Sequence, residues 1–175
     1  MLLAGSSEAT VWTVSPPGGG GQFPTIQAAV DAASPGDTVR VKAGSYPPFV
    51  LDKTLRVLGV GPSLVTVTAP SAPPATGAVA VAITAIPATG FAMVAGMKVV
   101  VADCCPTTCN AVFGSLPNHA VTVTGASAPV VLSNLDINPG HNGRGIKADL
   151  SQLLILDHVV VAAAPWGCGG ISPHR

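Results

Sequence analysis

The sequence has little charge and few aromatic side chains. Charged residues make up 9% and aromatic residues 4% of the 175 residues, and the formal net charge is zero. Without an excess of positive charge the chain cannot displace counterions from phosphates, so we predict no nucleic-acid partner. No apolar run approaches the roughly 18 residues that a membrane span needs, so we also predict no membrane span. Intrinsic disorder is excluded because 48% of the residues are hydrophobic.

The chain is instead rich in glycine, proline and β-branched residues, which suit short strands and tight turns. One helix is predicted after Thr25, a good N-cap, because Ile26, Ala29 and Val30 share one helical face. Pro35 ends this helix. Strands are predicted over residues 38–42, 55–60, 64–68, 78–84, 91–101, 120–124, 130–137, 145–149 and 153–161, with a turn at 43–46.

An internal repeat runs through these strands. The segments "VAGMKV" (94–99), "LSNLDI" (132–137) and "LDHVVV" (156–161) share one apolar pattern, and "VLGV" (57–60) begins in the same way. Their third positions are Gly59, Gly96, Asn134 and His158, residue types that tolerate left-handed backbone geometry. We predict a solenoid in which these four residues form one column of bends. Period-two alternation then predicts that Asp157 and His158 point to opposite faces and form no dyad.

The segment "FPTIQAAVDAA" (23–33), followed by "PGDTV" (35–39) and Gly44-x-Tyr46, resembles the N-terminal part of the pectin-lyase-like superfamily. This superfamily includes pectinesterases and pectate lyases. The specific resemblance covers residues 22–68 and implies an all-β fold, a right-handed parallel β-helix whose first turn is capped by the helix. We predict a β-helix domain over 22–175. It would be truncated at its C-terminus, because residues 169–172 look like the start of another turn.

Residues 1–21 are assigned to a signal-peptide remnant and linker. The opening "MLLAGSSEA" matches the end of a signal peptide, although an ordinary frayed N-terminus explains it equally well. The four cysteines, predicted to lie in loops on one side, favour an oxidising compartment. Disulfides are preferred over a metal there because C-C-x3-C lacks the C-x2-C spacing of zinc sites. The candidates are Cys104, Cys105, Cys109 and Cys168. We therefore predict a secreted or cell-surface protein.

A binding surface is predicted on the strands that begin near residues 119 and 145, where the resemblance places a binding cleft. Alternation points Val121, Val123, Ile146 and Ala148 inward. An exposed aromatic ring can stack on sugars, and cations can hold uronate carboxylates, which makes a polysaccharide or cell-surface glycan the predicted partner. The alternative is a solvated strand face that binds nothing. The candidate ligand-binding residues are His119, Thr122, Thr124, His141, Arg144, Lys147, Asp149 and Trp166.

Catalysis has weaker support in the sequence. Polyuronide elimination would need a base, with calcium or cations to stabilise the developing charge, yet only Asp149 and Asp136 are acids near the predicted face. The later signature segments of pectinesterases are also missing. We therefore predict a non-catalytic domain without a cofactor, and calcium only if the chain is a lyase. A lyase or pectinesterase fragment and a structural or adhesive solenoid are the two alternatives.

Overall fold

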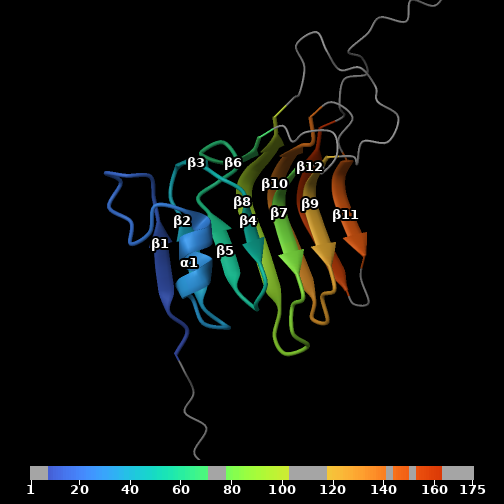
Figure 1. The fold of residues 1–175 in the computed structure, drawn as a ribbon, viewed down its shortest axis with the longest axis horizontal. Coiled ribbons are helices and arrows are strands. Elements are labelled where there is room, and N and C mark those ends of the chain that lie inside the picture. The colour runs from blue at the N-terminus through green and yellow to red at the C-terminus, as the bar shows by residue number, and fades with distance from the viewer. Residues whose placement is uncertain (1–7, 71–77, 103–117, 141–143, 150–152, 163–175) are drawn as a thin grey trace, which may run out of the picture.

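The computed structural model describes residues 8–70, 78–102, 118–140, 144–149 and 153–162. Within these residues the chain winds into two parallel sheets (Figure 1). The first sheet has the order β1 (Val11–Val14), β2 (Thr38–Val41), β5 (Arg56–Gly59), β8 (Ala92–Val101), β10 (Val130–Asn138) and β12 (Leu154–Val161). Two further strands belong to it: β6 (Val65–Ala69) pairs with the second half of β8, and β3 (Gly44–Tyr46) pairs with β6. The second sheet has the order β4 (Phe49–Leu51), β7 (Val79–Thr84), β9 (His119–Thr124) and β11 (Arg144–Asp149).

Successive strands alternate between the two sheets. The chain passes from β7 to β8, from β9 to β10 and from β11 to β12, and each strand pairs in parallel with its counterpart one turn away. Figure 1 shows this stack growing in chain order from β1 to β12. Apolar side chains of both sheets, such as Val121 and Leu132, are fully buried between them. The all-β solenoid predicted from the repeat is confirmed.

The predicted column of bends lies in the middle of the long strands of the first sheet. Gly96, Asn134 and His158 have φ angles of 68°, 49° and 50°, all in the left-handed region. The register skips these positions, since Ser133 pairs with Asp157 and Leu135 with Val159. Gly59 lies in the same column, but its φ angle is outside the left-handed region. Its glycine is required for another reason: a Cβ there would overlap the carbonyl oxygen of Gly96.

The single described helix, α1 (Ile26–Ala32), covers the β1 end of the core, as predicted. The hydroxyl of Thr25 accepts a hydrogen bond from the amide of Ala28 at 3.2 Å, which confirms the N-cap. At the other end, the Lys53 ammonium donates to the carbonyl oxygens of Val30 and Ala33 at 3.0 and 3.2 Å. This cation satisfies carbonyls that have no partner within the helix. In the described part of the chain no helix is long and apolar enough to cross a membrane.

Three short strands were not predicted. β1 lies inside the segment assigned to a remnant and linker, β3 lies where a turn was predicted, and β4 follows directly after it. Strands of three or four residues are too short to show a period of two, so the sequence signal is weak. β1 is held in place by Asp37, whose carboxylate accepts hydrogen bonds from the amide of Thr10 at 2.7 Å and from Nε1 of Trp12 at 2.9 Å.

Candidate functional site

Strands β9 and β11 of the second sheet carry six of the predicted ligand-binding residues, four on the outer face and two at the strand starts. In the ladder between β9 and β11, Arg144 is opposite His119 at the strand starts, and the outward pairs are Lys147 with Thr122 and Asp149 with Thr124. Parallel pairing sets such partners about 4.8 Å apart. We call this group the β9–β11 face; its members are His119, Thr122, Thr124, Arg144, Lys147 and Asp149.

The inward side of the same strands follows the predicted alternation. Val121 and Val123 of β9 are fully buried. Their ladder partners Ile146 and Ala148 are half-buried and exposed, respectively. The difference arises because, among the described residues, no strand of this sheet lies beyond β11. The alternation therefore fixes which way the side chains point, whereas burial depends on the neighbouring turn.

Positive charge dominates one half of the β9–β11 face. His119 is half-buried, and this burial, together with the positive charges of Lys147 and Arg144, lowers the pKa of its imidazole below the usual 6.5. The lowered pKa favours the neutral imidazole at pH 7, so the positive charge of this group lies mainly on Arg144 and Lys147. The Lys147 ammonium lies 2.9 Å from Oδ2 of Asp149. This ion pair is exposed, so it contributes little to stability and leaves the lysine accessible.

Carboxylates are scarce on this face. Asp149 is the one acid in strands β4, β7, β9 and β11, and it is paired with Lys147. Asp136, the second acid considered for catalysis, instead lies on β10 of the first sheet, with Oδ2 3.6 Å from the Lys98 ammonium. In the described ranges no three His, Cys, Asp or Glu side chains are grouped to hold a metal ion. The described strands thus offer an arrangement suited to binding hydroxyls and anions.

Several predicted residues lie outside the described residues. These are His141 and Trp166 of the candidate binding surface and the cysteines Cys104, Cys105, Cys109 and Cys168. Their roles in sugar stacking and in disulfide bonds remain predictions.

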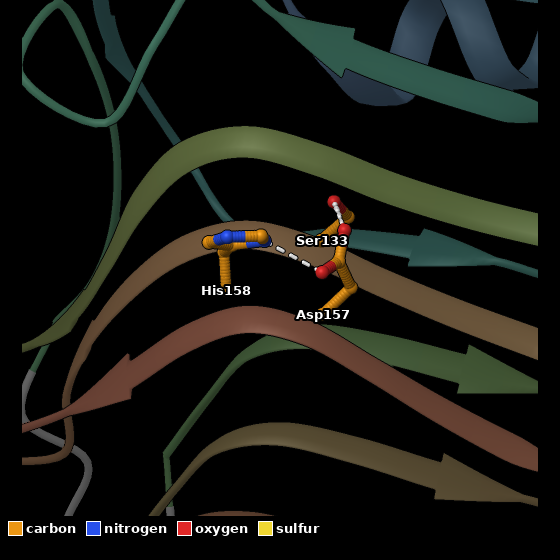
Figure 2. Close-up of polar contacts among 3 residues, drawn as sticks. All are labelled: Ser133, Asp157 and His158. Carbon is orange, nitrogen blue, oxygen red and sulfur yellow. Dashed lines mark hydrogen bonds and ion pairs between the residues drawn. The ribbon is translucent and has the colours of Figure 1, made fainter.

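A polar cluster at the bends was missed by sequence reasoning (Figure 2). The hydroxyl of Ser133 donates to Oδ2 of Asp157 at 3.0 Å, and Nδ1 of His158 lies 2.6 Å from Oδ1 of the same carboxylate. The prediction that Asp157 and His158 point to opposite faces is wrong. His158 adopts a left-handed conformation, which breaks the alternation and leaves two consecutive side chains exposed. The repeat alignment could have predicted the contact between Ser133 and Asp157, because both residues occupy the second position of their repeat segments and therefore pair in the ladder.

The order of contacts in this cluster does not match nucleophilic catalysis. A serine nucleophile needs the imidazole as its base, with the carboxylate behind the imidazole. Here the carboxylate of Asp157 lies between Ser133 and His158 and accepts from both. The hydrogen bond from Ser133, followed by that from His158, lowers the pKa of Asp157 below the usual 3.8. The cluster therefore holds a stable anion at the bend.

Comparison with known proteins identifies the fold. No family model and no curated protein matches the sequence. A solved structure of a pectin methylesterase mutant in complex with a hexasaccharide is similar, with a TM-score of 0.58 at 14% sequence identity over 86% of this chain. The chain spans 48% of that structure, about half of its length. The fold is thus the right-handed parallel β-helix of pectin-lyase-like proteins, as the resemblance in residues 22–68 implied.

Proposed function

We propose that this chain is a secreted or surface-exposed β-helix that binds an acidic polysaccharide along the β9–β11 face. The ladder of this face carries the proposal: it sets Arg144 beside His119 and Lys147 beside Thr122. Guanidinium and ammonium groups favour carboxylates, and the threonine hydroxyls can exchange hydrogen bonds with sugar hydroxyls. The hexasaccharide bound by the pectin methylesterase of similar fold supports a sugar chain as the ligand class.

The spacing of the face supports a polymeric ligand. Outward side chains recur about every 6.6 Å along a strand and about every 4.8 Å across strands, so polar groups form a regular grid. Thr84, Thr124 and Asp149 form one row of this grid across β7, β9 and β11. A chain of repeating sugars can contact such rows one residue after another. Several weak contacts then add up without a deep pocket.

The proposed role is binding without catalysis. The lone acid of the described strands of this sheet, Asp149, is paired with Lys147, and hydrolysis by a carboxylate pair needs two acids. A lyase or esterase fragment is the enzymatic alternative. It would release unsaturated products that absorb in the ultraviolet, or methanol, from a methylated polyuronide. A structural or adhesive solenoid would bind no soluble glycan.

Replacing Lys147 by methionine tests the face directly. We expect Lys147→Met to weaken binding to polygalacturonate about fivefold, because one favourable charge contact contributes about 1 kcal/mol. Asp149→Asn should have the opposite effect and tighten binding about twofold, because it removes a negative charge that faces the polyanion. Both dissociation constants are measured by isothermal titration calorimetry at low salt, where screening is weakest.

Lys98→Met is the matched control. Lys98 and Lys147 are 41% and 45% exposed, each lies on a strand, and each pairs with an aspartate. Lys98 belongs to the first sheet, so its replacement should leave polygalacturonate binding unchanged. If both lysine variants lost the same affinity for polygalacturonate, the attraction would be an unspecific effect of net charge, which would contradict the proposal. No measurable binding by the unaltered protein would favour the adhesive alternative.

A further inference from the structure

A hollow of about 490 Å³ lies on the first sheet, where the ends of β2 and β5 meet β1. It is lined by Thr13, Arg40 and Lys42, and by the apolar side chains of Leu58 and Val60. Its volume is in the range of small-molecule sites, about 300–1,000 Å³. None of these residues belongs to the β9–β11 face.

Two cations that have no acidic partner among the described residues line this hollow. Arg40 and Lys42 lie two residues apart on and just after β2, so both point outward while Val41 between them is fully buried. In the described part of the chain neither side chain forms an ion pair. The Lys42 ammonium donates to the carbonyl oxygens of Gly19 and Gly20 at 3.0 and 3.2 Å. These two bonds fix the ammonium in place and leave one of its three protons for a ligand.

The other side of the hollow is apolar. Leu58 is the ladder partner of Arg40 on β5 and is half-buried, and Val60 just after β5 is 55% exposed. Thr13, the partner of Arg40 on β1, adds a hydroxyl. One row across three strands therefore presents a hydroxyl, a guanidinium and an apolar surface in succession. Such a row is complementary to a molecule with an acidic group at one end and an apolar body at the other.

We propose that this hollow binds a small organic carboxylate. The Arg40 guanidinium holds the carboxylate through two parallel hydrogen bonds, and Lys42 and Thr13 contribute further donors. The apolar body of the ligand covers Leu58 and Val60, which removes exposed apolar surface from water. An inorganic oxyanion would leave most of the 490 Å³ unfilled. The site is separate from the proposed polysaccharide face and does not rest on it.

Three probes test both halves of this site in the full chain. Benzoate carries a carboxylate on an apolar body, benzamide is its uncharged analogue, and acetate is a carboxylate almost without a body. We expect benzoate to shift the backbone amide signals of Val41 and Gly59 in NMR titrations. Benzamide and acetate should each bind at least about tenfold more weakly, because each lacks one half of the interaction.

Arg40→Gln is expected to weaken benzoate binding about tenfold. Arg56→Gln is the matched control, since Arg56 is also an exposed arginine of the first sheet but stacks on the Phe91 ring at 4.9 Å. Thermal unfolding should be unchanged in Arg40→Gln because the described structure gives Arg40 no polar partner. Equal binding of benzamide would overturn the charged half of the site, and equal binding of acetate would overturn the apolar half. Unchanged binding in Arg40→Gln would overturn the assignment to this hollow.

Discussion

Gly96→Ala is expected to lower the free energy of unfolding by about 4 kcal/mol or more, or to prevent folding altogether. Two causes combine at this position. Gly96 has a φ of 68°, which costs an alanine roughly 1–2 kcal/mol. In addition, a Cβ would overlap the carbonyl oxygen of Gly59 on the neighbouring strand. Backbone atoms of paired strands cannot move apart without breaking the ladder between β5 and β8, so the overlap persists.

Asn134→Ala separates these two causes. Asn134 lies one turn along the same column, with a φ of 49° and an exposed side chain. Its replacement by alanine adds the left-handed strain without the overlap, so we expect a loss of about 1 kcal/mol. Asn134→Gly should be tolerated. Urea unfolding of the three variants provides the measurement. A loss in Gly96→Ala as small as that in Asn134→Ala would show that β5 and β8 do not pack as closely as described.

The sequence predicted the solenoid because its signals recur. Each turn repeats an apolar pattern with a residue that tolerates the left-handed region, and several repeats reinforce one another at Gly96, Asn134 and His158. Gly59 shows the limit of this reasoning. A position can require glycine because its φ angle is positive or because a neighbouring strand leaves no space for a Cβ atom. The sequence alone does not distinguish these two reasons, whereas the position of the neighbouring strand does. The short strands β1, β3 and β4 lie outside the repeated sequence pattern, so the repeat could not predict them.

The candidate face was predictable for the same reason, and the two other polar features were not. Strand alternation and the repeat alignment are sufficient to place Lys147 beside Thr122. The contact between Asp157 and His158 depends on how far a left-handed residue turns the chain, which alternation does not describe. The hollow beside Arg40 depends on strand β1, which the sequence did not reveal.

Zero net charge does not leave the surface electrically uniform. Several acids are engaged in local contacts: Asp37 with backbone amides and Trp12, Asp136 with Lys98, Asp149 with Lys147, and Asp157 with Ser133 and His158. Arg40 and Arg144 form no ion pair among the described residues. Positive charge that no described acid neutralises is thus present at the hollow and at the β9–β11 face. Anionic ligands remain compatible with a neutral chain when charges are segregated in this way.

Asp37→Ala is expected to cost about 3 kcal/mol, the second large effect. Asp37 as a whole residue is 3% exposed, and its carboxylate accepts hydrogen bonds from the amides of Thr10 and Ser34 and from Nε1 of Trp12, all between 2.7 and 2.9 Å. It thereby joins β1, the end of α1 and β2 in the cap of the solenoid. Removing it leaves three donors without their acceptor. Asp31→Ala is the control, because the exposed Asp31 accepts one bond, from Gln27, and should cost less than about 0.5 kcal/mol.

The pH dependence of the stability that Asp37 contributes shows whether the negative charge of its carboxylate is responsible. Burial by itself would raise the pKa of Asp37, but its hydrogen bonds from Trp12, Thr10 and Ser34 outweigh burial and lower the pKa below 3.8. A carboxylate with a lowered pKa stabilises the fold above its unfolded pKa, and this contribution disappears as pH falls through the folded value. The stability difference between the unaltered protein and Asp37→Asn, measured by urea unfolding, should therefore be constant from pH 7 to 5 and shrink below about pH 4. A difference that stays constant down to pH 2 would mean that ionisation of Asp37 does not contribute to stability.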